Sequence, residues 1–436
     1  MACLRAILIG LILGVTALPA HARDGAALRG EVLFGWYDLV LELVRHTPTY
    51  SPPVAARAFA YVGVISHEAQ AALDPRAQTL AGQLNGLTAF PEAKAGAAFD
   101  GAVVLDAALG AAMAGFFGNT GPTGQRAMQA MGDAMALRVE DGLDPEVVAR
   151  SRALGLAIAA HVADWAETDG GAVVENMGFP HDYSFGEDPD DWQPTSTVAL
   201  QQAPLLPDWG KVRPFAMPAA TACPVAPHPA FSKEQGSDFH ANALAVYHAS
   251  KALTPEQEEI ARFWSDDPML SPTPPGHWVS IVLQIARRDG LSADRTAGAL
   301  AVLGVAVADG FIGCWHEKYV YNLVRPVTYI KRYIDPEWET LLITPPFPEY
   351  PSGHSVQSGA AEAALTAVFG EDFAFDDATH EDDGLAVRHF ASFREAAEEA
   401  AVSRLYGGIH YPFANANGLE QGRCIGAFAA GLRLEK

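Results

Sequence analysis

Three short segments in the last third of the sequence carry the residues that are best suited to chemistry. They contain three long cations, a Ser-Gly pair and two histidines: Lys318, Arg325, Ser352, Gly353, His354, Arg404 and His410. Three cations can neutralise a tetrahedral anion, while a serine hydroxyl and the first N–H groups of a helix can donate hydrogen bonds to it. Two imidazoles then remain free for chemistry. The pattern predicts an oxyanion pocket that contains two histidines.

The first segment ends at Pro326. Residues seven apart return to almost the same angle on a helix, so Lys318 and Arg325 would share one face, two turns apart. Trp315 and Asn322 would lie on the same stripe. Pro326 should end the helix at or before Arg325, which leaves this cation free to swing toward a ligand. The competing interpretation is a solvated helix face, where Lys and Arg at helical spacing are usually found.

The second segment is a proline-rich approach, residues 344–351, that delivers Ser352 to the start of an Ala-rich helix. Ser352 is a natural N-cap, and this structural role alone would explain it. Gly353, however, lets a ligand come close to the backbone. His354 lies in the first turn, where the positive end of the helix lowers the pKa of its imidazole. We therefore expect this helix start to bind an anion and to present a histidine that exchanges a proton near neutral pH.

The third segment follows a helix that we expect from about residue 386. Arg404 would lie in the last turns of this helix, which should end at Gly407-Gly408, before Pro412. His410 would then project from the helix end. A single histidine in such a place is more often a structural hydrogen-bonding group. The combination with three cations and a second histidine favours the functional interpretation.

Composition places this pocket in a large acidic protein. The chain has 436 residues, of which 49% are hydrophobic and 19% are charged, so it can bury a sizeable core. Its 29 basic and 52 acidic residues give a net charge of -23, which argues against nucleic acid and anionic membranes as partners. In such a chain, a local group of three cations needs an anionic partner to offset its mutual repulsion.

The first 22 residues resemble an export signal. Arg5 gives a positive start, residues 6–18 are apolar, and Ala20-His21-Ala22 offers a small-x-small cleavage pattern. The apolar run is too short for a membrane span, and no later stretch reaches about 18 uninterrupted apolar residues. We expect cleavage after Ala22 and a soluble mature protein that is periplasmic or secreted. Its three cysteines (Cys223, Cys314 and Cys424) allow one disulfide at most, and the sequence holds no Cys-x-x-Cys metal pair.

The rest of the sequence predicts an all-α fold of two packed helical bundles. Apolar residues recur every three or four positions near 31–45, 54–74, 95–118, 124–140, 145–168, 277–289, 294–324, 353–369 and 386–407. Thr254 and Gln257 have the spacing of a capping box at another helix start. Ten of the 30 prolines fall within residues 171–235, which predicts an irregular connecting segment. The predicted units are therefore an N-terminal bundle (23–170), this segment, and a C-terminal bundle (236–436) that carries the oxyanion site.

The pattern Lys-x6-Arg-Pro, Pro-Ser-Gly-His and Ser-Arg-x5-His resembles the signature shared by vanadium-dependent haloperoxidases and the type 2 phosphatidic acid phosphatase superfamily. The resemblance covers residues 254–412. It implies a helical-bundle fold that holds vanadate or phosphate between the bundles. The oxyanion would be bound by Lys318, Arg325, Ser352, Gly353 and Arg404. His410 would be the direct vanadium ligand, or the phosphoryl-accepting nucleophile of a phosphatase, and His354 the acid–base residue.

Neighbouring residues are more similar to the haloperoxidase branch, in its bacterial exported form. Trp315 resembles an active-site tryptophan of the chloroperoxidase type, and Phe347 falls where brominating relatives place a histidine. Asp267 lies in the region from which the family supplies an acidic partner for the last arginine. One departure is Ala414, because many relatives have an acid at this position that orients the final histidine. We expect a backbone carbonyl, Asn415 or Asn417 to orient His410 instead.

The resemblance thus implies a vanadate-dependent haloperoxidase that uses hydrogen peroxide to oxidise a halide, with an organic acceptor as a further partner and no haem or flavin. The first alternative is an acid phosphatase with a phosphohistidine at His410. The second is an inactive exported protein that only binds an oxyanion.

Two other features have simpler interpretations. His277 is expected to be a structural histidine rather than a third catalytic imidazole. The segment from Glu371 to Asp383 contains seven acids in 13 residues. We expect a solvated loop there rather than a cation site.

Overall fold

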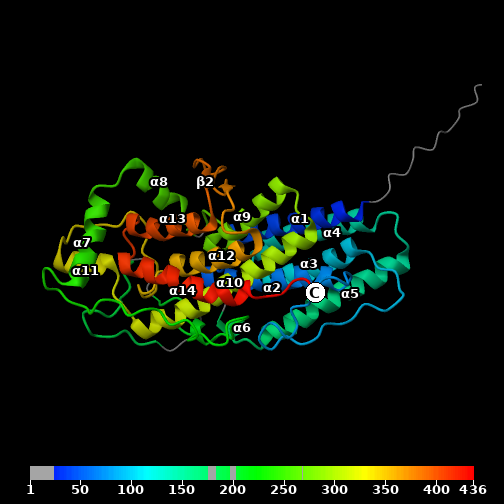
Figure 1. Ribbon diagram of the computed structural model, residues 1–436, viewed down its shortest axis with the longest axis horizontal. Coiled ribbons are helices and arrows are strands. Elements are labelled where there is room, and N and C mark those ends of the chain that lie inside the picture. Colours follow the sequence, from blue (N-terminus) through cyan, green and yellow to red (C-terminus); the bar gives the residue numbers. More distant parts are fainter. Residues whose placement is uncertain (1–23, 175–182, 197–202, 268) are drawn as a thin grey trace, which may run out of the picture.

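Helices dominate the computed structural model, which describes residues 24–174, 183–196, 203–267 and 269–436 (Figure 1). Within these ranges the single sheet is an antiparallel pair of short strands, β1 (Phe375–Asp377) and β2 (Arg388–Phe390). The prediction of an all-α fold is therefore confirmed. The expected export signal, residues 1–22, lies outside the described residues.

The first helices begin at residues suited to capping. The Asp24 carboxylate accepts hydrogen bonds from the backbone N–H groups of Ala26 and Ala27. Asp144 caps a helix in the same way, with Pro145 as the first helical residue. The helices of this part are α1 (Gly25–Arg45), α2 (Pro52–Ala71), α3 (Gly101–Phe116), α4 (Gly121–Glu140), α5 (Pro145–Glu167) and the short α6 (Gly171–Val174).

The later helices carry two of the predicted caps. Thr254 and Gln257 form the capping box, with both reciprocal hydrogen bonds in place. Ser352 is the N-cap of the Ala-rich helix. The helices of this part are α7 (Asp238–Lys251), α8 (Pro255–Phe263), α9 (Thr273–Asp289), α10 (Ala293–Tyr321), α11 (Pro326–Tyr333), α12 (Gly353–Phe369), α13 (Phe393–Tyr406) and α14 (Pro412–Ala430).

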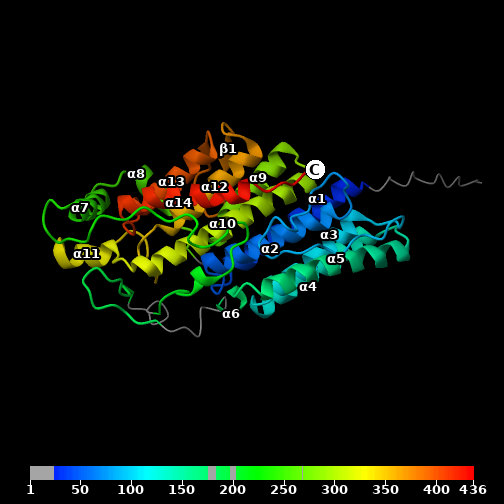
Figure 2. The ribbon, with the colours of Figure 1, turned by 60° about the horizontal axis from the view of Figure 1, so that its bottom comes forward.

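Helix α10 is the central element of the packing. It contacts α2 on the side of the N-terminal helices, and α12 and α14 on the other side (Figure 2). By length and composition α10 is apolar enough to cross a membrane, but its apolar stretch is completely buried inside the protein. It is therefore the core helix between two bundles, and its last turns reach the predicted pocket.

Two glycines let α2 and α10 approach closely. A Cβ atom on Gly63 of α2 would lie 2.8 Å from the Cα atom of Ala301 and from the carbonyl oxygen of Leu300. A Cβ atom on Gly304 of α10 would lie 2.9 Å from the Cα atom of Ala60. Real Cβ atoms do not come this close to backbone, so the spacing of the two bundles depends on these glycines.

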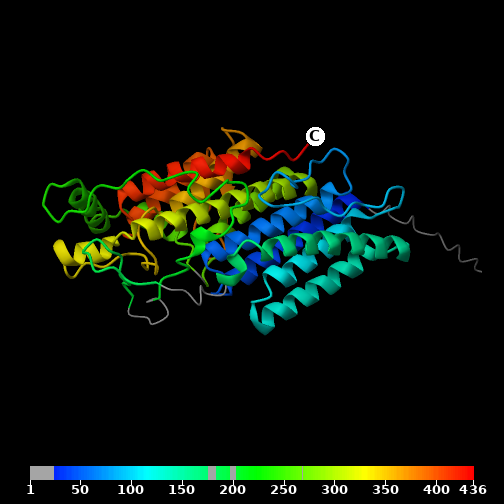
Figure 3. The ribbon, with the colours of Figure 1, turned by 90° about the horizontal axis from the view of Figure 1, so that it is seen from below.

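Residues 203–237 of the proline-rich segment run along the second bundle, and Figure 3 shows this part in green beside α14. Its aromatic side chains Trp209 and Phe215 are buried. The buried Asp309 carboxylate of α10 accepts the backbone N–H of Phe215 at 2.6 Å. A disulfide between Cys223 and Cys424 ties the segment to α14, which confirms the predicted limit of one bridge.

Three predictions about helices were incomplete or wrong. The helix expected from residue 386 begins only at Phe393, because residues 388–390 pair as strand β2. Helix α10 ends at Tyr321, and Asn322 adopts a left-handed conformation with a φ of 48°. Arg325 is consequently not on the helix that carries Lys318. Helices α7, α11 and α14 were not anticipated.

We predict that Gly63→Ala will lower the free energy of unfolding by about 1–3 kcal/mol, because the added methyl group forces α2 away from α10. Urea denaturation followed by circular dichroism measures this change. Gly30→Ala is the matched control, since a Cβ atom at Gly30 of α1 has no atom within 4 Å. It should be neutral or stabilise the protein by up to about 1 kcal/mol through helix propensity. Equal effects of the two substitutions would contradict the close packing.

Candidate oxyanion-binding site

Lys318 lies in the last turn of α10, with its side chain fully buried. Its ammonium group donates hydrogen bonds to the carbonyl oxygens of Pro348 at 3.0 Å and Glu349 at 2.9 Å, and to that of Pro351. Three carbonyls thus match the three donors of the ammonium group. Burial lowers the pKa of Lys318 to about 7. The buried cation holds the loop before α12 in place.

Arg325 reaches the same loop from the N-cap position of α11. Its Nε donates to the carbonyl oxygen of Phe347 at 2.9 Å, and its Nη1 donates to that of Ile409 at 3.0 Å. Nη1 also lies 3.2 Å from Nε2 of His410. Nη2 is buried and has no hydrogen-bond partner among the described residues. Arg325 thus contacts the same loop as Lys318, but its position at the N-cap of α11 places it there, and not a shared face of one helix as predicted.

The start of α12 brings the Ser-Gly pair beside Lys318. A Cβ atom on Gly353 would lie 3.6 Å from the Trp315 ring and 3.9 Å from Cε of Lys318, so a side chain would fill the space above the helix end. The hydroxyl oxygen of Ser352 accepts the backbone N–H of Ser355 at 3.4 Å, which makes it a weak helix cap. The hydroxyl proton and the first N–H groups of α12 remain suited to an anion.

His354 in the first turn of α12 is partly buried, and its Nε2 atom is buried with no hydrogen-bond partner among the described residues. The nearest carboxylate is that of Asp266, whose Oδ2 lies 3.8 Å away. Burial, followed by the charge of Arg404, holds the pKa of His354 well below its usual value. The imidazole is therefore neutral at neutral pH. The sequence predicted the direction of this pKa shift, and burial is its largest cause.

Arg404 lies in the last turn of α13, as predicted. Its Nε donates to Oγ of Ser403 at 3.0 Å, and its Nη2 donates to the carbonyl oxygen of Trp264. No carboxylate of the described residues forms an ion pair with it. Burial lowers the pKa of Arg404 to about 10, and the nearby charges of Asp266 and then Asp267 oppose this shift. Asp267 was the expected acidic partner, but Asp266 has the larger influence.

His410 is oriented by a residue that the sequence analysis missed. Its Nδ1 lies 2.9 Å from Oε1 of Glu349, and the same oxygen accepts the backbone N–H of Tyr411 at 2.9 Å. The expected partner was a backbone carbonyl, Asn415 or Asn417, but the two asparagines bond to Ser355 and Tyr350 instead. The one signal in the sequence is that Glu349 is the single acid within the apolar, proline-rich approach to Ser352.

These partners fix the tautomer of His410. Glu349 accepts the Nδ1 proton, whereas the Arg325 guanidinium can only donate and therefore faces an unprotonated Nε2. Burial, followed by the charges of Arg325 and Lys318, holds the pKa of His410 well below its usual value. Burial raises the pKa of Glu349 itself to about 7, although both cations oppose this shift. His410 thus presents a neutral, unprotonated Nε2, whose lone pair faces the Arg325 guanidinium.

Aromatic side chains form the wall above the cations. The ring of Phe347 lies 4.9 Å from that of Trp315, and the charged groups of Lys318 and Arg325 lie 5.0 and 4.9 Å from its centre. The cavity beside these two rings has a volume of about 110 Å³, enough for about three or four water molecules. Its lining includes Trp315, Phe347, Gly353, His354, Arg404, His410 and the expected Asp267. A larger cavity of about 620 Å³, beside α2 and the start of α10, is lined by none of these residues.

Together the three segments form one small, largely buried site with excess positive charge. A tetrahedral oxyanion fits the donors that are left over, above all the buried Nη2 of Arg325 and the N–H groups at the start of α12. The lone pair of His410 and the unpartnered Nε2 of His354 lie on the same cavity. The arrangement can therefore bind an oxyanion, coordinate or attack its central atom, and exchange a proton with a co-substrate.

Comparisons with known proteins agree on one fold. A family model for the second helical-bundle domain of vanadium chloroperoxidase (VCPO) matches residues 299–434. Vanadium chloroperoxidase of Curvularia inaequalis is 26% identical over 38% of this chain, and the match spans only 37% of that protein. The crystal structure of a bacterial vanadium-dependent iodoperoxidase is 39% identical, with a TM-score of 0.83, over 93% of this chain and 97% of that chain. A holo-type bacterial vanadium-dependent chloroperoxidase, at 16% identity and a TM-score of 0.69, shares the fold over 89% of this chain and 93% of its own.

We predict that the affinity for sulfate, whose charge is constant near neutral pH, falls as the pH rises through about 7. Below this pH Lys318 is protonated and Glu349 is neutral, whereas above it the cation is lost and an anion appears. Both changes disfavour a bound anion, by up to about tenfold per pH unit for each group. Isothermal titration calorimetry measures the profile. Lys331→Met, which removes a surface cation, should leave its shape unchanged, and a flat wild-type profile would contradict the prediction.

Proposed function

Because the chain belongs to the vanadium haloperoxidase family, we propose that it is a vanadate-dependent enzyme that uses hydrogen peroxide to oxidise a halide to a hypohalous species. The observation that carries the proposal is the state of His410. Its Nδ1 is bonded to Glu349, and its neutral Nε2 faces Arg325 at the edge of the cavity. A neutral imidazole held by a carboxylate on its far nitrogen is the form that binds metals.

Vanadate, when bound, would supply a Lewis acid that activates peroxide without a change in its oxidation state. The chain's own residues would prepare the site for it. Lys318, Arg325 and Arg404 would balance the oxyanion charge, while Ser352 and the N–H of Gly353 would donate hydrogen bonds. His410 would bind through Nε2.

His354 would be the acid–base residue. Its Nε2 is buried, has no partner among the described residues and lies on the cavity. Because burial and Arg404 hold its pKa low, a proton taken up from peroxide is readily released again. The ring is fixed in the first turn of a rigid helix, so the transfer needs no large movement of the chain.

A phosphatase is the second candidate, since a neutral, carboxylate-oriented His410 also suits a phosphohistidine intermediate. The aromatic wall argues for the peroxidase. Trp315 and Phe347 line a cavity of only about 110 Å³, which leaves little room for the organic part of a phosphate ester. The case for an inactive homologue rested on Ala414, and Glu349 supplies the carboxylate that this position lacks.

We also propose that the protein is exported. The support is the charged start, apolar run and cleavage pattern of residues 1–22. The disulfide between Cys223 and Cys424 adds to it, because such bonds persist in oxidising compartments.

A paired assay tests the function. With orthovanadate and hydrogen peroxide, the wild-type protein should halogenate an indicator in the presence of iodide or bromide, and His410→Ala should abolish the activity. His46→Ala, which changes an exposed histidine, is the matched control. Hydrolysis of a phenyl phosphate without vanadate would instead identify a phosphatase. Vanadate binding without either turnover would identify an inactive binding protein.

The substitution Glu349→Gln distinguishes an anion that binds to His410 from one that is held by the cations alone. Loss of the carboxylate leaves His410 less basic and less well oriented, so vanadate affinity should fall by about 10–100-fold. Sulfate binds through the cations alone, and its affinity should stay the same or rise because a negative charge is lost. Glu339→Gln, on the surface, should change neither affinity. Parallel losses for both anions would show that Glu349 acts only on the shape of the pocket.

A further inference from the structure

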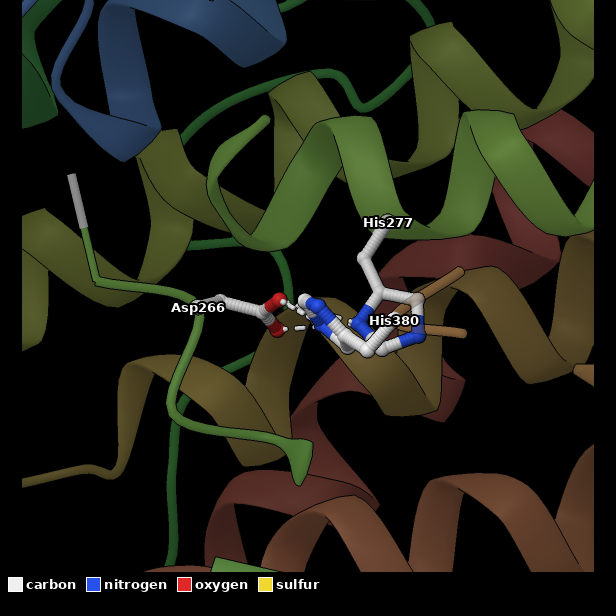
Figure 4. Close-up of side chains that lie close together, drawn as sticks. All are labelled: Asp266, His277 and His380. Carbon is white, nitrogen blue, oxygen red and sulfur yellow. Dashed lines mark hydrogen bonds and ion pairs between the residues drawn. The ribbon is translucent and has the colours of Figure 1, made fainter. Parts of the chain in front are cut away.

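A second cluster of histidines and carboxylates lies behind His354. Asp266, His277 and His380 are all buried, and one ligand atom of each lies within 4.8 Å of the others (Figure 4). Asp266 lies between α8 and α9, His277 is in the first turns of α9, and His380 follows β1. These residues come from three separate segments, so no local turn explains why their ligand atoms converge.

The distances within the cluster suit a shared cation. Oδ1 of Asp266 lies 3.0 Å from Nδ1 of His277 and 3.4 Å from Nε2 of His380. Ligands bound tetrahedrally at zinc distances lie about 3.3 Å from one another. Figure 4 shows both rings turning a nitrogen toward the carboxylate.

The outward nitrogens of both rings are held by carboxylates. Nε2 of His277 lies 2.8 Å from Oδ2 of Asp377, and Nδ1 of His380 lies 3.1 Å from Oδ2 of Asp383. A metal-binding histidine commonly donates its other N–H to a carboxylate, which fixes the tautomer and makes the ligand nitrogen more basic. Here both rings have that support, and in both the nitrogen left for a metal faces Asp266.

The surroundings are dry and the backbone is constrained. The Trp264 ring stacks on His277 at 4.5 Å, and the edge of Phe263 covers His380 at 5.2 Å. Asp266 has a φ of 49°, an uncommon conformation for a residue with a side chain. Its other oxygen, Oδ2, lies 3.8 Å from the unpartnered Nε2 of His354. One side of the cluster therefore remains open toward the pocket.

A proton on His277 is the competing occupant of the cluster. Burial alone would lower the pKa of His277, but the charges of Asp266 and Asp377 outweigh it and raise the pKa to about 10. That proton satisfies His277 alone. Nε2 of His380 still lies 3.4 Å from Asp266, and Nε2 of His354 still has no hydrogen-bond partner among the described residues. A divalent cation would engage both rings at once, and its charge is better matched to the buried carboxylates.

We propose that Asp266, His277 and His380 form a second metal site, which binds a divalent transition-metal cation of the zinc class and has one coordination position facing His354. Two imidazoles and one carboxylate are the donor set that such cations prefer. Asp377 and Asp383 orient the ligands. The cation joins α9, the segment after β1 and the loop before α9, whose residues 265–267 line the oxyanion cavity. It would thus fix one wall of the pocket.

Metal analysis of the full chain, purified without a histidine tag, tests the proposal. We expect about one zinc per chain by plasma mass spectrometry and, after dialysis against a chelator, rebinding with a Kd below about 1 µM. Cobalt should give the visible absorption bands of a site with nitrogen ligands, and zinc should raise the melting temperature. These readouts hold whether or not haloperoxidase activity is found.

Variants locate the site. His380→Ala should weaken zinc binding by about 100-fold or more, and Asp377→Asn by about 10–100-fold. His389→Ala is the matched control, because His389 is exposed on β2 and pairs only with Asp376 among the described residues. Should His380→Ala fail to fold, His380→Gln keeps the size of the side chain and gives the same comparison. Folded wild-type protein that binds neither zinc nor cobalt, or variants that bind as the wild type does, would leave the proton on His277 as the occupant and overturn the proposal.

Discussion

The burial of three cations in an otherwise apolar interior is the constraint on which the site depends. Burial lowers the pKa values of Lys318, Arg325 and Arg404, which means that each charge is costly where it lies. The protein offsets the cost mainly with backbone carbonyls, which turn inward from the three loops that contain Glu349, Ile409 and Trp264. Carbonyls stabilise a cation without neutralising it. The pocket therefore keeps a surplus of positive charge that an oxyanion can balance.

This constraint also explains the course of the chain around the pocket. Residues 347–351 form no helix or strand and instead present four carbonyls to Lys318 and Arg325. Prolines suit such a segment because they have no N–H group that would need a partner in the interior. The segment then enters α12 directly, so the groups that hold the cations and those that meet the anion belong to one rigid element. In a rigid site, little conformational entropy is lost when the anion binds.

Motif spacing in the sequence singled out the cations and histidines of the pocket, but not the residues that support them. Arg404 and His410 line the common cavity, and Lys318 lies beside Gly353, which also lines it. Motif spacing and helix ends could predict these residues because both are local properties. Glu349 orients His410, which lies 61 positions away in the sequence, and no periodic pattern predicts such a pairing. Arg325 was assigned to a helix that ends four residues earlier, because the left-handed turn at Asn322 has no glycine to announce it. Strand β2 was read as helix since it has only three residues.

The two histidines of the pocket, His354 and His410, differ most in the distance from the imidazole to the neighbouring carboxylate. Glu349 bonds to His410 at 2.9 Å, whereas Asp266 lies 3.8 Å from His354 and bonds to His277 instead. A short bond on the far nitrogen fixes one tautomer, which suits a permanent ligand. A longer contact leaves the ring free to gain and lose a proton, which suits acid–base work. Asp266 bonds to His277 and therefore does not bond closely to His354. The cluster behind the pocket thus determines that His354 suits acid–base work rather than permanent binding of a ligand.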